Sequence, residues 1–171
     1  MLQRAFYLGA ILLGMLLTVA ALVFLGFVYA EGRGADREVI PFLIVPAFVP
    51  MGCGYLLHLI LLYQMWAAIP RESARTTPLA AAGLMLIPLW NLYWVFQAYW
   101  GWTKDYNRFV ADRRIEAPRA SEAAALAYAI TAAGAVVPVL GFCLGPIALL
   151  LLLFVLHQGI SGISAIRTAQ R

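Results

Sequence analysis

The stretch TTPLAAAGLMLIPLWNLYWVFQAYWGWTKDYNRF, residues 76–109, decides the fold of this chain. It is apolar for most of its length and ends in a dense polar cluster, which predicts a transmembrane helix that continues into the cytoplasm. Thr77 is placed to cap this helix, and Pro78 suits its first turn, where a missing N–H costs nothing. Pro88 lies inside the run and predicts a kink near Leu84.

Six residues of this stretch share one side of the predicted helix, because they are spaced by alternating fours and threes. The face combines indole rings, an amide, a bare glycine and two cations, which lipid-facing residues do not normally include. We therefore expect it to contact protein, within the chain or on a partner. The alternative for the aromatic residues is a belt at the membrane interface, which Tyr99, Trp100 and Trp102 fit best. The predicted interface consists of Trp90, Trp94, Gln97, Gly101, Lys104 and Arg108.

The same stretch resembles a family of bacterial multi-pass membrane proteins. The shared features are a Thr-Pro start, an Ile-Pro pair, an Asn-Leu-Tyr-Trp run, a Gly-Trp step and Lys-Asp-Tyr-Asn. They stand at Thr77–Pro78, Ile87–Pro88, Asn91–Trp94, Gly101–Trp102 and Lys104–Asn107, and the upstream run MWAAI at 65–69 is also similar. The resemblance implies a bacterial membrane fold and implies no activity.

The composition is that of an integral membrane protein. Of 171 residues, 64% are hydrophobic and only 12% are charged, which lies well outside the range of soluble domains. The net charge of +4 is modest, so the basic excess indicates a cytoplasmic face and not a nucleic-acid site. Cys53 and Cys143 do not form a metal-type or redox-type pair, and we expect both to stay unpaired.

Hydropathy predicts an all-α, polytopic bundle of five transmembrane helices in a single membrane domain, 1–171. The first apolar run is too long for the core of a signal peptide. The last third also admits a second interpretation, four spans plus a re-entrant hairpin, because GFCLGP at 141–146 predicts a tight turn. The expected spans are 5–29, 44–69, 78–103, 122–140 and 146–166, with a cytoplasmic loop over 104–121 that ends at the helix cap Ser121.

Basic residues orient this bundle. Five spans leave Arg4, Arg71 and Arg75 on one side of the membrane and nine cations on the other. Because the cytoplasmic side carries the excess of Lys and Arg, we expect the N-terminus outside and the C-terminus in the cytoplasm of a bacterial inner membrane. The nine cations are Arg33, Arg37, Lys104, Arg108, Arg113, Arg114, Arg119, Arg167 and Arg171.

The expected spans contain no Asp, Glu, Lys or Arg near their centres, which argues against ion-coupled transport. Polar side chains at the bilayer centre seldom face lipid, so we expect a hydrogen-bonded layer inside the bundle, each bond contributing about 0.6 kcal/mol. A sharper alternative is that His58 and His157 bind a haem or another pigment, because imidazole is a common haem ligand. The expected layer consists of His58, Asn91, Thr131, His157 and Gln158.

The sequence carries no phosphate loop, no serine-triad signature, no paired carboxylates within a span and no metal-spaced cluster. We therefore predict that the protein is not an enzyme. The favoured function is a small subunit or scaffold that lies in membrane lipid and binds other membrane proteins or further copies of itself. The alternatives are an electron-transfer protein that uses the two histidines, and a small-molecule transporter or channel.

Overall fold

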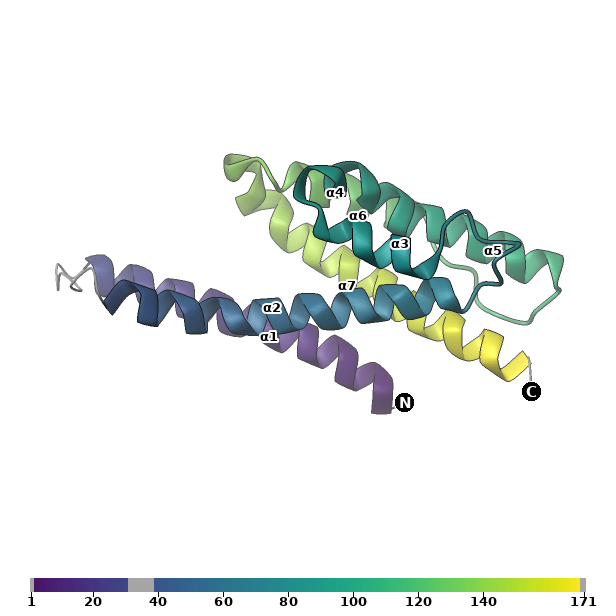
Figure 1. Cartoon of the computed structure of the whole chain (residues 1–171), viewed down its shortest axis with the longest axis horizontal. Helices are drawn as coiled ribbons and strands as arrows, with labels where there is room; N and C mark the ends of the chain where they lie inside the picture. Colours follow the sequence, from purple (N-terminus) through teal and green to yellow (C-terminus); the bar gives the residue numbers. More distant parts are fainter. Residues whose placement is uncertain (1, 31–38, 170–171) are drawn as a thin grey trace. The chain divides into compact units, whose positions relative to one another are not determined.

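The computed structural model describes residues 2–30 and 39–169 (Figure 1). All regular secondary structure in these residues is helical and none of them forms a strand, which confirms the all-α class. The chain divides into two compact units, Met1–His58 and Leu59–Arg171, and each is described by itself.

The N-terminal unit contains α1 (Leu2–Ala30) and the first part of α2 (Val39–Ala67). The two helices approach each other closely at glycines. A Cβ atom on Gly14 would lie 2.5 Å from the carbonyl oxygen of Pro50, and one on Gly54 would lie 3.6 Å from that of Ile11. Small residues permit such close backbone approach between membrane helices. Ile11, which precedes Gly14 in α1, meets Gly54, which follows Pro50 in α2. The two helices therefore run antiparallel.

In the C-terminal unit, the single helix expected over residues 78–103 is not present, because the chain reverses within it. The reversal lies at Ile87, whose backbone is extended (φ −91°, ψ 109°). Pro88 explains this break, since a proline disfavours the helical conformation of the residue before it. One arm comprises α3 (Pro78–Gly83) and a 3-10 turn (Leu84–Leu86); the other comprises α4 (Pro88–Val95), a π-helical segment (Phe96–Gly101) and α5 (Trp102–Asp112) (Figure 1).

Contacts between the two arms show that they are antiparallel. Near the reversal, Trp94 Nε1 donates a hydrogen bond to the carbonyl oxygen of Ala81 at 3.1 Å. Farther from it, Arg75 pairs with Asp105 at 2.7 Å. We call residues 75–112 the α3–α5 hairpin and residues 84–89 its tip.

A second hairpin follows, formed by α6 (Glu122–Gly134) and α7 (Pro138–Ala169). The tight turn expected at 141–146 is wrong, because the chain turns at 135–137 and α7 runs through Pro146. Pro138 stands at the first position of α7, where a proline is favoured, so the helix begins upstream of the glycines. The predicted spans 122–140 and 146–166 are therefore replaced by a shorter α6 and a longer α7.

Four large aromatic side chains form the core of the C-terminal unit: Trp66, Tyr99, Trp102 and Tyr106. The rings of Trp102 and Tyr106 are stacked, with centroids 4.9 Å apart. Each buried indole N–H has a partner, since Trp66 donates to the carbonyl oxygen of Ala98 and Trp102 to that of Met65. The aromatic-belt interpretation is therefore wrong for Tyr99 and Trp102.

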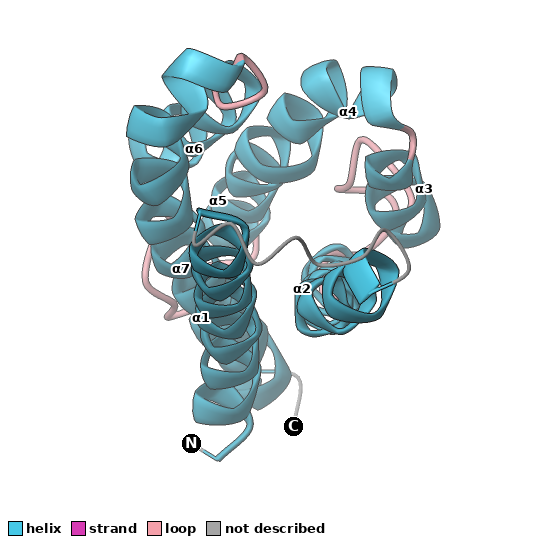
Figure 2. Ribbon diagram, turned by 90° about the vertical axis from the view of Figure 1, so that its left-hand side faces the viewer, coloured by secondary structure: helices cyan, strands magenta, loops and turns pink. Residues whose placement is uncertain are grey.

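Helix α7 fits against this core through two glycines. A Cβ atom on Gly159 would lie 2.6 Å from the sulfur of Met65, and one on Gly162 would lie 2.7 Å from the Tyr106 ring. In the end-on view of Figure 2, α4 lies between α3 and α6.

Two helical stretches are long and apolar enough to cross a membrane, Phe48–Ala67 in α2 and Cys143–Ala169 in α7. Helix α6 has 13 residues and extends about 20 Å, less than the hydrocarbon thickness of about 30 Å. The two long stretches agree with membrane association of the chain, and α3, α4 and α6 are each shorter than a membrane span.

Candidate functional site

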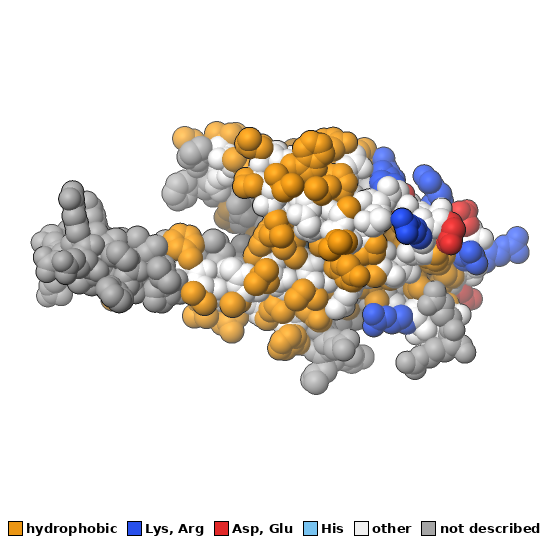
Figure 3. Space-filling model, in the orientation of Figure 1, with side chains coloured by type: hydrophobic (Ala, Val, Ile, Leu, Met, Phe, Trp, Pro, Cys, Tyr) orange, Lys and Arg blue, Asp and Glu red, His pale blue; other side chains and the backbone are white. Residues whose placement is uncertain are grey.

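The charged side chains described in the C-terminal unit gather at one end, the end opposite the tip of the α3–α5 hairpin (Figure 3). They come from the loop 70–77, from α5, from the loop 113–121 and from the adjoining ends of α6 and α7. We call this end the polar base. Its residues are Arg71, Glu72, Arg75, Lys104, Asp105, Arg108, Asp112, Arg113, Arg114, Glu116, Arg119, Glu122 and Arg167.

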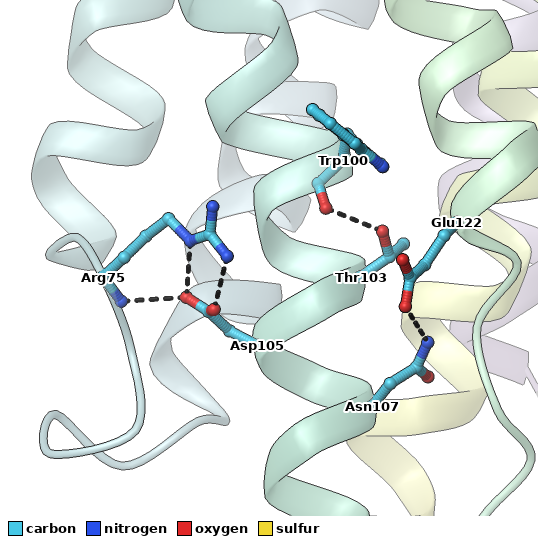
Figure 4. A network of polar contacts seen from close by, with 6 residues as sticks. All are labelled: Arg75, Trp100, Thr103, Asp105, Asn107 and Glu122. Atoms are coloured by element: carbon cyan, nitrogen blue, oxygen red, sulfur yellow. Dashed lines mark hydrogen bonds and ion pairs between the residues drawn. The ribbon is translucent and has the colours of Figure 1, made fainter.

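The centre of the polar base is a bidentate ion pair between Arg75 and Asp105 (Figure 4). Arg75 Nη2 donates to Asp105 Oδ1 at 2.7 Å, and Arg75 Nε donates to Oδ2 at 3.0 Å. The backbone N–H of Arg75 adds a third bond to Oδ2 at 2.9 Å. The Asp105 side chain is 2% exposed, and its hydrogen bond to Arg75 raises the pKa of that guanidinium, although partial burial opposes the rise.

This ion pair corrects the predicted topology. An arginine and a carboxylate 2.7 Å apart lie on the same side of a membrane. The expectation that Arg71 and Arg75 lie across the membrane from Lys104 and Arg108 is therefore wrong. Its cause was the assumption that residues 78–103 cross the bilayer as one helix.

Gly101 makes close contact with Arg75 of the same chain. A Cβ atom on Gly101 would lie 3.3 Å from Arg75 Cδ and 3.5 Å from Nε, so the bare glycine leaves room for the guanidinium stem. The close approach expected at Gly101 is thus present, and its partner is a side chain within the α3–α5 hairpin.

The structure divides the predicted interface into two parts. Trp94 and Gly101 turn inward to the α3 arm, where they contact Ala81 and Arg75. A π-helix has an extra residue in its turn, so Lys104 and Arg108, which follow it, do not keep the α-helical spacing from Trp90 and Trp94 that the prediction assumed. Thr103 Oγ1 donates to the carbonyl oxygen of Trp100 at 2.9 Å within the same region (Figure 4).

The other four predicted residues lie on the surface beside two aromatic neighbours. The Trp90 and Tyr93 rings meet edge to face at 6.1 Å. Gln97 Nε2 donates to the Tyr93 hydroxyl at 3.0 Å in an exposed position. Lys104 Nζ lies 3.4 Å from the centroid of the Trp100 ring, a cation–π contact. We call this set the outer face: Trp90, Tyr93, Gln97, Trp100, Lys104 and Arg108.

Side-chain amides fix the loop 113–121 to the helices. The Asn107 amide donates to the carbonyl oxygen of Ala120 and accepts from its N–H, both at 2.9 Å. Gln158 Oε1 accepts from the backbone N–H of Ser121, also at 2.9 Å. The Tyr106 hydroxyl donates to the carbonyl oxygen of Pro118, and burial raises the pKa of this phenol.

The residues expected to form a central polar layer do not bond to one another. Gln158 lies at the polar base, and His157 beside it is exposed. Thr131 donates to carbonyl oxygens of its own helix, and Asn91 Oδ1 is buried with no partner within the described residues. His58 is buried in the N-terminal unit, with its ring 5.6 Å from that of Tyr55.

The Arg75–Asp105 pair was not predicted from the sequence. The signals that the sequence offers are an arginine just before a helix cap and an acid among apolar residues of a predicted helix. Cys53 and Cys143, expected to stay unpaired, both carry free thiols. Comparison of the chain with protein-family models, with curated proteins and with solved structures returns no match.

Proposed function

We propose that this protein is a small, non-catalytic integral membrane protein that binds a partner protein within the membrane through its outer face. The observation that carries this proposal is the exposed Gln97–Tyr93 pair. Gly101 contacts Arg75 at the polar base, and Gln97 lies one helical turn, about 6 Å, farther toward the apolar tip. Lipid chains offer nothing to the remaining donor and acceptor of the amide, whereas a neighbouring helix can bond to both.

The composition of the outer face supports the same proposal. Tryptophan, tyrosine and arginine are enriched at the energetically important positions of protein interfaces. Here, Trp90 and Tyr93 present two adjoining rings on the apolar side, and Arg108 stands at the polar side. By contrast, the polar groups of Arg75, Asp105 and Asn107 are engaged in bonds within the chain and serve to hold the face in position.

We propose further that the polar base faces the cytoplasm of a bacterial inner membrane, because its cations outnumber its acids. The resemblance to bacterial multi-pass proteins agrees with this location and adds no activity.

Site-specific photocrosslinking in native membranes tests the proposed interface. A photoreactive phenylalanine analogue replaces Trp90 in one variant and Leu150, an exposed residue of α7, in the control. We expect discrete protein adducts at Trp90, either a doubled mass or a heterologous band, and lipid adducts alone at Leu150. Gln97→Leu should remove the Trp90 adduct. Lipid adducts alone at both positions would contradict the proposal.

A further inference from the structure

The tip of the α3–α5 hairpin is apolar throughout, with the sequence LMLIPL. Leu86, Ile87 and Leu89 are 58%, 49% and 84% exposed. Turns that end in water are dominated by Gly, Asn, Asp, Ser and Pro, because polar side chains and solvent then satisfy the backbone. Of these residues the tip contains only Pro88, so its composition suits hydrocarbon.

Several backbone carbonyl oxygens at and beside the tip accept hydrogen bonds from within the hairpin. Ala81 receives the indole N–H of Trp94 from the opposite arm, and Pro88 brings no N–H that needs an acceptor. Internal satisfaction of this kind is what a non-helical segment needs at membrane depth. The carbonyl oxygens that accept hydrogen bonds around the turn are those of Ala80, Ala81, Leu84 and Ile87.

The hairpin is too short to cross a bilayer. The α3 arm, made of 6 residues in α3 and 3 in the 3-10 turn, rises about 15 Å, and the other arm rises about 25 Å between Asp105 and Pro88. The hydrocarbon core is about 30 Å thick. A hairpin that starts at one interface therefore turns within the hydrocarbon, short of the opposite interface.

The opposite end of the hairpin is suited to the interface. The ion pair between Arg75 and Asp105 joins its two arms there, and Lys104 lies over the Trp100 ring. Tryptophan and lysine are common at headgroup depth, and basic residues are attracted to anionic lipid. The charges fix which end stays at the surface, and the exposed leucines fix which end enters.

We infer that the α3–α5 hairpin is a re-entrant element, which enters the membrane from the side of the polar base and turns within the hydrocarbon. The tip contacts lipid acyl chains. This inference does not depend on a protein partner at the outer face, because the tip residues Leu86, Ile87 and Leu89 lie outside that set.

Cysteine labelling in sealed membrane vesicles of both orientations tests the inference. In a Cys53→Ala, Cys143→Ala background, single cysteines replace Glu72, Arg113 or Leu89, all exposed residues. We expect a membrane-impermeant maleimide to label positions 72 and 113 from the same side and position 89 from neither side. A nitroxide at position 89 should collide with oxygen more often than with a polar nickel chelate.

Three results would overturn the inference. Labelling of positions 72 and 113 from opposite sides would mean that the segment between them spans the membrane. Labelling of position 89 from the side opposite to position 72 would mean a hairpin that crosses completely. Labelling of position 89 from the same side as position 72 would mean that the tip stays in water. Intrinsic tryptophan fluorescence of each variant monitors the fold.

Discussion

The two ends of the α3–α5 hairpin are held together by different kinds of interaction. At the polar base, Arg75 and Asp105 make three hydrogen bonds between residues 30 positions apart. At the tip, one indole bond and short-range backbone bonds close the turn, and the side chains of Leu86, Ile87 and Leu89 are exposed. The comparison teaches that the geometry of the hairpin is set at its base, whereas the tip contributes its affinity for hydrocarbon.

The largest expected effect is at the base. Arg75→Ala would leave the buried Asp105 carboxylate without its counter-ion. We expect the free energy of unfolding to fall by about 3 kcal/mol, the low end of the usual range for a broken buried pair, because Arg75 is 35% exposed. Unfolding in detergent, followed by circular dichroism, measures the loss. The double variant Arg75→Ala, Asp105→Ala should recover most of it, since no buried charge remains. A double variant as unstable as the single one would show that the ion pair does not fix the base.

A smaller effect is expected where α7 meets the base. In Gly162→Ala, the new methyl group would overlap the Tyr106 ring, and such overpacking costs about 1–3 kcal/mol. Gly145→Ala in the same helix is the matched control, because a Cβ atom there would meet nothing within 4 Å. Both are measured by the same detergent unfolding. Equal effects of the two changes would argue against close packing at Gly162.

The free energy of unfolding should also depend on pH in the alkaline range, because of Tyr106. Its folded-state pKa is raised by burial, so the fold favours the neutral phenol. The stability from this preference is fully present below the unfolded pKa of about 10 and is lost as the pH rises through the higher folded value. Tyr106→Phe should cost about 1 kcal/mol at neutral pH, from the lost bond to Pro118, and should remove this alkaline loss. Unfolding measured between pH 8 and pH 12, together with tyrosinate absorbance, gives the cost at neutral pH and the alkaline loss of stability. The control is Tyr63→Phe, at an exposed position, which should keep the alkaline loss.

The smallest effect is expected at the tip. Leu89→Ala should change the free energy of unfolding by no more than about 0.5 kcal/mol, because the side chain is 84% exposed. Leu62→Ala, in the core of the same unit, should cost about 2–5 kcal/mol in the same assay. A large loss from Leu89→Ala would mean that the tip packs against protein in the assayed state.

Local features of the α3–α5 hairpin were predictable from sequence. Thr77 Oγ1 accepts from the backbone N–H of Ala80, and Ser121 Oγ accepts from that of Ala124, which confirms both helix caps. A kink near Leu84 was also predicted from Pro88, and the helix loosens there into the 3-10 turn Leu84–Leu86. These signals lie within four residues of their effects, so hydropathy and capping patterns are sufficient to find them.

The reversal and the ion pair were not predictable in the same way. A proline breaks a helix but does not set the direction of the chain beyond it. The direction follows from contacts between residues far apart in sequence, such as Trp94 with Ala81 and Arg75 with Asp105. The surroundings of Gln158 depend on distant contacts in the same way, because the turn before α7 brings its side chain to the backbone N–H of Ser121.

The π-helical segment Phe96–Gly101 makes the rotational phase of α5 sensitive to chain length. One residue corresponds to about 100° of rotation around an α-helix. Deletion of a single residue there, such as Ala98, would restore regular α geometry and turn all of α5 by that angle relative to α4. Asp105 would then face away from Arg75, although composition and hydropathy would hardly change. In an alignment, a one-residue gap between 96 and 101 would therefore mark an exchange of the inward and outward surfaces of α5.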